Sequence, residues 1–432
     1  MSPSSSTTRI AARCVSSFLS FVFMATVSYP ARLRATIRVQ PSSQMEQIRR
    51  KLEAGEARIG GVLSGTSADG IDVSVGRFGL EGGNLRLLEA VIHRTRPWPE
   101  DLGPRVRACL DGAPQNLSQT ALLHRDLGRA FGRAVREVCE GEGLPLDLLG
   151  SHGQTVYHHD GVEPSGPASL QLGDGDFVAE EAGCPVVSDF RQADLAAGGQ
   201  GAPLSGYADD VLFAEQPEPL CVLNLGGMAN LTWLNGEQLL AFDTGPAGAL
   251  LDGLARRHLG EPMDRDGAAA AAGAVLPHTL ATQLDHPFFE EPLPKSTGRD
   301  TFGEAWIRAW GGPENSAQDL LATGVRLVAE SVAQEMGRSL PCMPDTLWVA
   351  GGGVHNGALM DALQDALAAR DSACKVVPSG DAGVDPDGRE GLIFAVLAAR
   401  WVMGQGVTRP QASGAALGRV LGKLSPGALP PR

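Results

Sequence analysis

Two glycine-rich turns, each placed after a short apolar strand, constrain the fold of this chain more than any other feature of its sequence. The first lies within Gly61–Asp72 (GVLSGTSADGID) and the second is Gly226–Gly227. A run of three predicted strands contains each turn, and helical patterns follow each run. The expected strands are residues 58–63, 71–78 and 85–93 in the first run and 221–225, 229–234 and 238–242 in the second. This repetition predicts a duplicated α/β architecture with two lobes.

The last third of the chain continues the α/β pattern. Its expected elements are helices at 315–336, 357–369 and 389–402 and a strand at 346–349 that runs into Gly351, Gly352 and Gly353. A triple glycine that begins a helix suits close approach to a nucleoside, although a plain strand–helix turn fits the same residues. The length of 432 residues also favours two lobes, which we expect at 58–215 and 216–432.

Charge and composition limit the classes of partner. The formal net charge is −14, which argues against nucleic acid or an anionic membrane as the main partner. ATP can still bind locally to backbone N–H groups, a helix N-terminus and a divalent cation. The seven cysteines form no CxxC motif, so we expect reduced thiols, no zinc site and a cytoplasmic protein. No stretch has the roughly 18–20 apolar residues that span a bilayer.

The first 44 residues differ from the rest, because they contain five arginines and no acidic residue. Three interpretations compete: a targeting peptide, a disordered extension, or translated sequence upstream of a true start at Met45. We favour the third and expect residues 45–432 to fold and work alone. Because the regular pattern begins near Arg58, we treat residues 1–57 as an extension outside the fold.

The segment Ser64–Gly70 has the composition of an anion-binding loop. Its glycines allow close backbone approach, and its hydroxyl and N–H groups supply hydrogen-bond donors. It is not a Walker A loop, since GK[ST] is missing and no helix follows. An ordinary serine–glycine hairpin is the alternative. The pairing with the turn Asn224–Gly227, which could hold the other side of a triphosphate, favours a nucleotide site.

Asp243 is the candidate general base. It stands in Phe242–Pro246 (FDTGP) at the end of a predicted strand, with Pro246 placed to begin a helix. A carboxylate in this position could take a proton from water or from a sugar hydroxyl beside the phosphates. The alternative is a helix N-cap.

Two polar segments are candidates for a sugar site. Gly150–Thr155 (GSHGQT) follows the expected strand 146–149, and its side chains suit hydrogen bonds to sugar hydroxyls. Ser188–Leu204 (SDFRQADLAAGGQGAPL) places Asp189 and Arg191 directly after another strand. A salt bridge between Asp189 and Arg191 is the alternative for that pair.

The segment Pro294–Asp300 (PKSTGRD) carries two cations and two hydroxyls beside a glycine. From its composition alone we expect a solvated loop. No cluster of His, Cys or carboxylate residues has the spacing of metal ligands.

Taken together, these segments resemble the motifs of the anhydro-N-acetylmuramic acid kinases in their order, spacing and residues. The resemblance runs from about Gly60 to Gly427 and includes the motifs GVLSGTSADGID, GSHGQT, QLGDGD, SDFRQADLAAGGQGAPL, LNLGGMANLT, FDTGP, MDRDG, PKSTGRD, AGGGVHN and LGKLSPG. It implies a two-lobed, actin-like fold of duplicated ribonuclease-H-like lobes, with the nucleotide in the cleft between them. It also implies that ATP and water convert 1,6-anhydro-N-acetylmuramic acid to N-acetylmuramic acid 6-phosphate and ADP in peptidoglycan recycling.

The resemblance assigns roles to particular residues. Asp243 corresponds to the base that activates water, and Mg²⁺ would neutralise the phosphates. The residues expected at the sugar are Thr155, Asp189, Arg191 and Glu390. Those expected at the nucleotide are Gly65, Thr66, Ser67, Ala68, Asp69, Gly70, Ile71, Asp72, Gly226, Gly227, Gly351, Gly352 and Gly353.

The sequence departs from the family pattern in three places, and the first of them is nearest the base. Ala247–Gly248 stand where Gly-Asn is usual, Gly175–Asp176 where Pro-Asn is usual, and Met263 where an aromatic residue is usual. Two alternatives therefore stay open: a related phosphotransferase that acts on another sugar, and a nucleotide-binding sensor without turnover. A homodimer is compatible with the sequence and is not specified by it.

Overall fold

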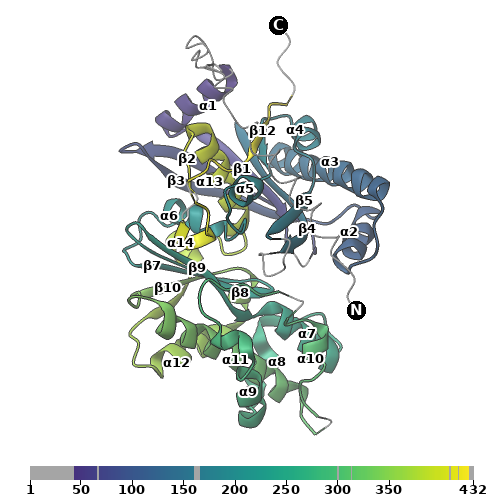
Figure 1. The fold of residues 1–432 in the computed structure, drawn as a ribbon, viewed down its shortest axis with the longest axis vertical. Coiled ribbons are helices and arrows are strands. Elements are labelled where there is room, and N and C mark those ends of the chain that lie inside the picture. The colour runs from purple at the N-terminus through teal and green to yellow at the C-terminus, as the bar shows by residue number, and fades with distance from the viewer. Residues whose placement is uncertain are drawn as a thin grey trace, which may run out of the picture. The chain divides into compact units, whose positions relative to one another are not determined.

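The structure, a computed structural model, describes residues 43–65, 68–159, 166–298, 301–312, 314–407, 410–416 and 418–427. Within residues 43–432 the chain forms two β-sheets with helices packed against them (Figure 1). Thr66, Ser67, Arg299 and residues 1–42 lie outside the described residues. The expectations for them therefore stay predictions.

The first sheet has seven strands in the order β12-β6-β4-β1-β2-β3, with β5 paired to β4. They are β1 (Ala57–Ser64), β2 (Ile71–Glu81), β3 (Asn84–Arg96), β4 (Leu148–His159), β5 (Ala168–Leu172), β6 (Val186–Ser188) and β12 (Lys423–Ser425). The meander β1-β2-β3 is antiparallel, whereas β4 runs parallel to β1 and β6 runs parallel to β4.

The second sheet repeats this arrangement with five strands in the order β11-β10-β7-β8-β9. They are β7 (Leu220–Leu225), β8 (Met228–Asn235), β9 (Gln238–Pro246), β10 (Thr346–Ala350) and β11 (Lys375–Pro378). Here β7-β8-β9 is an antiparallel meander, and β10 and β11 add in parallel beside β7. The order β3-β2-β1-β4-β6 thus matches β9-β8-β7-β10-β11, and the predicted two-lobed, actin-like duplication is confirmed.

Alternating side chains of β7 show how the layers are built. Cys221 and Leu223 face a core formed with helices of the second lobe, whereas Leu220 and Val222 face a core shared with the first lobe. The helices of the second lobe are α7 (Gly248–His258), α8 (Ala268–Ala272), α9 (Pro277–Leu284), α10 (Glu304–Ile307), α11 (Ala317–Ser339) and α12 (Gly357–Ala368). Those that follow the strands of the first lobe are α2 (Leu102–Leu110), α3 (Leu117–Glu142), α4 (Gly175–Ala182), α5 (Gln192–Ala196) and α6 (Asp209–Leu212).

Helix α13 (Arg389–Met403) returns to the first sheet, although the expected boundary assigns it to the second lobe. A Cβ atom on Gly61 of β1 would lie 1.8 Å from the carbonyl oxygen of Gly391, and one on Gly150 of β4 would lie 2.1 Å from that of Phe394. Backbone therefore packs directly on backbone, which only glycine allows at these strand positions. Strand β12 also joins the first sheet, beside β6, after α14 (Pro410–Ser413).

The fold begins earlier than the sequence analysis expects. Residues 43–54, which we placed in an extension, form helix α1 (Ser43–Ala54). Met45, Ile48 and Leu52 are buried in the core beside α13, and Lys51 forms an ion pair with Asp147 at 2.5 Å. These apolar residues recur at the spacing of one helix face.

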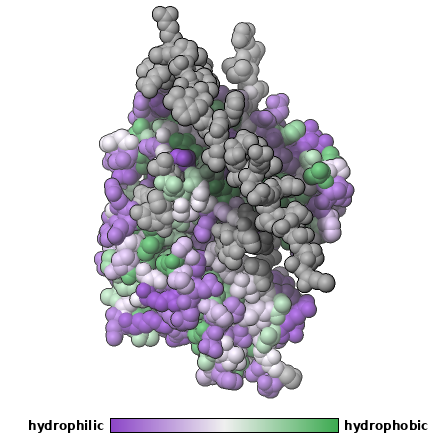
Figure 2. Space-filling view, in the orientation of Figure 1, coloured by the Kyte–Doolittle hydropathy of each residue, from purple (hydrophilic) through white to green (hydrophobic). Residues whose placement is uncertain are grey.

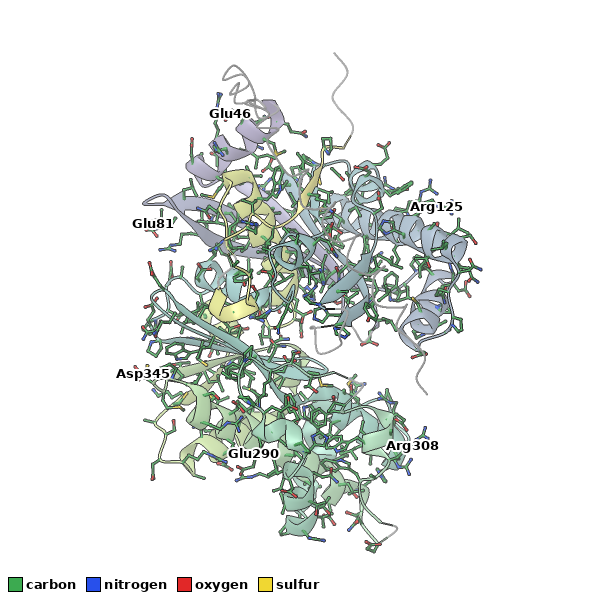
Figure 3. All side chains as sticks on the ribbon, viewed as in Figure 1. Glu46, Glu81, Arg125, Glu290, Arg308 and Asp345 are labelled. Atoms are coloured by element: carbon green, nitrogen blue, oxygen red, sulfur yellow. The ribbon has the colours of Figure 1, made fainter. Side chains whose placement is uncertain are left out.

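The surface carries mixed charge. On the face shown in Figure 2, hydrophilic residues dominate and hydrophobic ones occur in small groups. Figure 3 places Glu46, Glu81 and Arg308 at the periphery, where each belongs to an exposed ion pair of the kind that contributes little stability. Among the described helices, none combines the length and the apolar character needed to cross a bilayer.

Candidate active site

The glycine turns of the second lobe lie side by side. Strands β7 and β10 pair in parallel, with Ala350 opposite Asn224, so Gly226–Gly227 and Gly351–Gly353 leave the sheet at the same edge. A Cβ atom on Gly351 would lie 2.8 Å from the carbonyl oxygen of Leu225, and one on Gly353 would lie 2.5 Å from the side chain of Leu225. The two turns are thus closely packed and expose main chain at the carboxyl ends of the strands. This position suits binding of an anion or a nucleoside.

The first-lobe loop is short and held at both ends. The N–H group of Ala68, which has a φ of 53°, donates to the carbonyl of Gly65 at 3.1 Å. The Trp98 indole N–H donates to the carbonyl of Ala68 at 3.0 Å. Gly70 precedes Ile71, the first residue of β2, and a Cβ atom there would lie 2.8 Å from the carbonyl oxygen of Arg96. Asp69, between Ala68 and Gly70, is exposed.

Asp72 lies just beyond this loop, and neighbouring side chains fix its position. The hydroxyl of Thr95 on β3 donates to Asp72 Oδ1 at 2.6 Å. Next to Thr95, His93 is 3.1 Å from the hydroxyl of Ser74, which in turn donates to the carbonyl of Gly388 at 2.8 Å. Burial raises the pKa of Asp72, and the hydrogen bond from Thr95 limits that rise.

Glu390 connects the two lobes. Its Oε1 accepts a hydrogen bond from the Asn224 side chain at 3.2 Å, directly before the Gly226–Gly227 turn. Burial raises the pKa of Glu390, and the negative charge of Asp72 adds to the rise. The structure therefore places Glu390 beside the glycine turns. Within the described residues, no hydrogen bond or ion pair joins it to Thr155, Asp189 or Arg191.

Asp243 lies within β9 and does not cap a helix, so the N-cap alternative is wrong. The N–H group of Thr297 donates to Asp243 Oδ2 at 2.8 Å, and the N–H group of Asp243 donates to the carbonyl of Lys295 at 3.1 Å. No described group donates to the other oxygen, Oδ1. Burial raises the pKa of Asp243 to about 7, while the hydrogen bond from Thr297 and the charge of Lys295 limit the rise. A carboxyl group with this pKa can exchange a proton near neutral pH.

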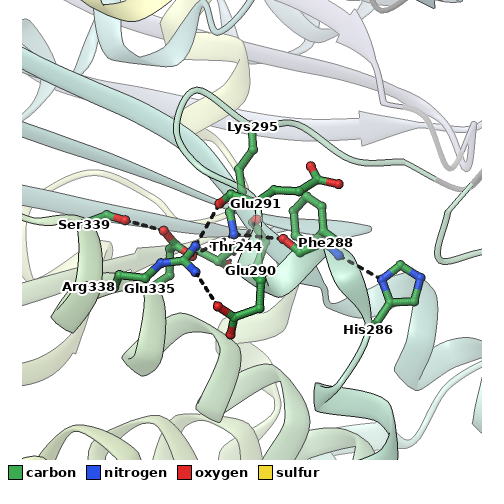
Figure 4. A network of polar contacts seen from close by, with 10 residues as sticks. Thr244, His286, Phe288, Glu290, Glu291, Lys295, Glu335, Arg338 and Ser339 are labelled. Atoms are coloured by element: carbon green, nitrogen blue, oxygen red, sulfur yellow. Dashed lines mark hydrogen bonds and ion pairs between the residues drawn. The ribbon is translucent and has the colours of Figure 1, made fainter.

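We expected Pro294–Asp300 to be a solvated loop. This expectation is wrong for Lys295, which lies in the described part of the segment. The Lys295 side chain is buried, and its Nζ lies 2.7 Å from Glu335 Oε2 on α11 (Figure 4). Nζ also donates to the carbonyl of Phe288 at 3.2 Å and lies 4.6 Å from the Phe288 ring centroid. Composition could not reveal this, because Lys295 and Glu335 are far apart in the sequence.

Ala247 and Gly248, two of the residues that depart from the family pattern, bond to the Gly226–Gly227 turn. The N–H group of Ala247 donates to the carbonyl of Gly227 at 3.0 Å, and that of Gly248 to the carbonyl of Gly226 at 2.9 Å. A Cβ atom on Gly248 would lie 2.9 Å from the carbonyl oxygen of Gly226. Glycine at position 248 therefore allows the start of α7 to pack closely on the turn.

The segment Gly150–Thr155 lies inside β4, not after a strand as expected. It presents His152 Nε2 to the Arg191 guanidinium at 3.2 Å and to the Thr155 hydroxyl at 3.4 Å. Burial lowers the pKa of His152 well below its usual value, with the charge of Arg191 adding to the effect. A neutral imidazole that accepts from Arg191 satisfies this contact.

Several buried polar atoms near His152 have no hydrogen-bond partner among the described residues. They are His152 Nδ1, Gln154 Oε1, Gln171 Oε1 and Arg191 Nε. The Gln171 amide also donates to the Thr155 hydroxyl at 3.2 Å, so Gln171, Thr155, His152 and Arg191 form one cluster, and the Gln154 amide lies next to it on the Thr155 carbonyl at 3.2 Å. Buried polar atoms are normally paired, and a polyhydroxylated ligand could satisfy such a cluster.

Asp189 and Arg191 do not pair with each other. Asp189, with a φ of 60°, forms an ion pair with Lys423 of β12. Arg191 donates to the carbonyl of Gly201 at 2.7 Å as well as to His152. The loop that follows is held by buried Asp194, which accepts from Gly201 N–H and from the Ser413 hydroxyl. The internal Asp189–Arg191 salt bridge is therefore not formed.

Three groups of candidate residues emerge: the glycine turns with Asp72 and Glu390, Asp243 with the 295–297 segment, and His152 with Thr155 and Arg191. No hydrogen bond or ion pair between described residues joins Asp243 to the sugar candidates. Sequence analysis missed Glu335 and assigned Lys295 to a solvated loop. It included Asn224 in the Asn224–Gly227 turn without giving its side chain a role.

Comparison with known proteins shows which family this chain belongs to. The sequence model of the anhydro-N-acetylmuramic acid kinase family matches residues 57–427. The chain is 37% identical to the anhydro-N-acetylmuramic acid kinase of Gloeobacter violaceus, over 85% of this chain and 98% of that protein. It is 40% identical to the protein of the same name from Xanthomonas axonopodis pv. citri, over 85% of this chain and 97% of that protein.

Among solved structures, one match is a glucokinase of the ROK family from Streptomyces griseus in complex with glucose and AMPPNP. It has 15% identity and a TM-score of 0.37, and covers 80% of this chain and 100% of that chain. The family assignment rests on the sequence matches, which extend over most of the chain. This chain belongs to the anhydro-N-acetylmuramic acid kinase family.

Proposed function

We propose that this protein is an ATP-dependent kinase that converts 1,6-anhydro-N-acetylmuramic acid and water to N-acetylmuramic acid 6-phosphate. Family membership over residues 57–427 supports the substrate class. The observation that carries the chemistry is Asp243, a half-buried carboxyl group with a pKa of about 7 and one oxygen without a hydrogen-bond donor among the described residues. Such a group can act as a general base at neutral pH.

The reaction needs one proton acceptor. Asp243 Oδ1 takes a proton from water, and the hydroxide oxygen bonds to the anomeric carbon. The bond between that carbon and the bridging oxygen breaks, and the bridging oxygen attacks the γ-phosphorus. The bond from the γ-phosphorus to the β-phosphate oxygen breaks and ADP leaves. Protonated Asp243 then releases its proton to solvent, which completes the balance.

ATP would lie against the glycine turns of both lobes. The main chain at Gly70, Gly226–Gly227 and Gly351–Gly353 offers N–H groups and close approach, which suit phosphates and a nucleoside. We expect Mg²⁺ to arrive as part of Mg-ATP. Among the described residues, no group of three or more His, Cys, Asp or Glu side chains could hold a metal ion.

The sugar would lie against the cluster of Thr155 and Arg191. The unpartnered Arg191 Nε supplies a donor, and the unpartnered side-chain oxygens of Gln154 and Gln171 supply acceptors. We further propose that the protein works in the cytoplasm, on the anhydro sugar released during peptidoglycan recycling. Asp189 and Glu390 stay in the proposal as groups at the edge of the site.

The experiment uses protein, Mg-ATP and the anhydro sugar in ¹⁸O-water, with prompt mass spectrometry of the product. We expect one ¹⁸O atom at the anomeric position of a sugar 6-phosphate, formed together with ADP. ADP formation with ordinary sugars and none with the anhydro sugar would indicate a different phosphotransferase. ATP binding without turnover on any sugar would indicate a sensor. Either result would contradict the proposal.

A further inference from the structure

Lys295 and Glu335 form a fully buried ion pair, and Lys295 belongs to the segment that contacts the candidate base. The side chains of Lys295 and Glu335 are 1% and 3% exposed, and Lys295 Nζ lies 2.7 Å from Glu335 Oε2. Apolar residues of similar size can often replace a buried ion pair without loss of stability. Stability alone therefore does not account for this pair, and its position relative to Asp243 becomes informative.

The main chain that carries Lys295 holds Asp243 at two points. The carbonyl of Lys295 accepts from the N–H group of Asp243 at 3.1 Å, and the N–H group of Thr297 donates to Asp243 Oδ2 at 2.8 Å. The Lys295 side chain runs into the protein from this segment and is anchored on Phe288 and Glu335 (Figure 4). Moving that anchor would move the donor that orients the carboxyl group.

The charged side chains around the Lys295–Glu335 pair alternate in sign. Glu335 accepts from Lys295 and also from Arg338 at 2.7 Å, and the Ser339 hydroxyl donates to its other oxygen. Arg338 in turn lies 3.5 Å from Glu290 on the 3-10 helix Pro287–Glu290. Among the described residues, Lys295 is the charged residue that acts on Asp243, and its charge favours the ionised carboxyl group.

We propose that Lys295 and Glu335 are positioning residues for the base: Lys295 fixes the orientation and charge of Asp243, and Glu335 sets how strongly Lys295 acts. This inference rests on the proposed function, because it assumes that Asp243 accepts a proton during turnover. Neither side chain needs to touch the substrate. Their effect passes through the Lys295–Thr297 main chain and through the electrostatic field.

The two members of the pair should shift the protonation of Asp243 in opposite directions. Lys295→Met removes a positive charge that favours the carboxylate, so the pKa of Asp243 should rise. Glu335→Gln removes the counter-charge, so Lys295 should act more strongly and the pKa of Asp243 should fall. In the double variant K295M/E335Q no unpaired charge stays buried, and the pKa should lie between those of the single variants.

The test measures kcat/KM for the anhydro sugar between pH 5 and pH 9 in the wild type and the three variants. Each single substitution should move the acid limb by about one pH unit, which is a tenfold change in rate on that limb. The limb should move to higher pH in K295M and to lower pH in E335Q. Arg308→Gln, which breaks the exposed Glu304–Arg308 pair of the same lobe, is the matched control and should leave the profile unchanged.

A second measurement does not depend on activity. The carboxyl ¹³C signal of Asp243 in aspartate-labelled protein, identified by its absence in Asp243→Asn, should titrate with the same order of pKa values. If wild-type protein does not use the anhydro sugar, the proposed function fails, and this titration still decides the inference.

Equal loss of activity at all pH values in both single variants, with an unmoved ¹³C titration, would overturn the inference. It would show that the pair has a structural role alone. If one single variant does not fold, the other decides the question: a ¹³C titration that moves from the wild-type position in the predicted direction supports the inference, and an unchanged titration contradicts it. If neither single variant folds and the double variant does, the pair has a structural role alone and the inference is overturned.

Discussion

In the first lobe, Asp72 lies at the start of β2 beside the Gly65–Gly70 loop and accepts a hydrogen bond from the Thr95 hydroxyl. In the second lobe, Asp243 lies on the third strand of the corresponding meander and accepts from a main-chain N–H group, with a buried lysine behind it. Both carboxyl groups have raised pKa values, and burial is the main cause in both.

The difference between the lobes is in what surrounds each carboxyl group. Asp72 belongs to a chain of side-chain hydrogen bonds that reaches His93 and Ser74, which suits a structural or nucleotide-side role. Asp243 has one oxygen without a donor among the described residues and a pKa of about 7. One strand order, used twice, can therefore supply a binding loop in one lobe and a proton acceptor in the other.

The largest expected effect on stability comes from the close helix contact of the first lobe. Gly61→Ala would bring a Cβ atom to 1.8 Å from the carbonyl oxygen of Gly391, so α13 must shift. We expect a loss of about 3 kcal/mol in the free energy of unfolding, measured by urea denaturation. Gly227→Ala is the control from the second lobe, because its nearest neighbour would be 3.9 Å away. Equal destabilisation by both substitutions would show that the α13 contact is not special.

The next effect concerns the pH dependence of stability. Asp243 has a folded-state pKa of about 7, above the value of 3.8 for an unperturbed aspartate, so the folded protein keeps a proton that the unfolded chain releases. This group's contribution to stability should therefore fall as pH rises from about 4 to about 7. The Asp243→Asn variant lacks this pH dependence. Its free energy of unfolding, relative to that of the wild type, should therefore increase by on the order of 2 kcal/mol from about pH 4 to about pH 7, after a discount for solvent screening. A difference that is constant with pH would refute the raised pKa.

The smallest effect concerns Asp72. Thr95→Val removes the hydroxyl that donates to Asp72 Oδ1, so the pKa of Asp72 should rise further and the protein should lose about 1 kcal/mol of stability. Turnover should change less than in any variant of Asp243. Thr120→Val on the exposed face of α3 is the control for loss of a threonine hydroxyl. If Thr95→Val abolished turnover, the division of roles between the lobes would be wrong.

Much of the fold could be predicted because its signals are local. The strands of both meanders and the helices α11, α12 and α13 match the expected ranges within a few residues, since periodicity and turn residues define them. Helix α1 was missed because three apolar residues in a short polar segment do not reveal what they pack against. The return of α13 to the first sheet depends on a close contact between glycines distant in the sequence, which no local pattern reports.

The same distinction applies to the site. Asp243 and the glycine turns could be predicted from short motifs, although Asp243 proves to lie inside β9. The burial of Lys295 could not be predicted, because its partner Glu335 lies on a helix that is far away in the sequence and because lysine is normally exposed. The cluster of His152, Thr155 and Arg191 likewise depends on β4 and the segment after β6 meeting in space.

Single-turnover ring opening by Asp243→Asn tests the central claim most directly. The side-chain amide oxygen of the variant can still accept a hydrogen bond from the Thr297 N–H group. The amide is not basic enough to take a proton from water. We predict unchanged folding, ATP affinity within about threefold of wild type, and release of ¹⁸O-labelled sugar 6-phosphate slowed by roughly 10²-fold or more. Release at a rate close to that of wild type would contradict the account and remove Asp243 from the role of base.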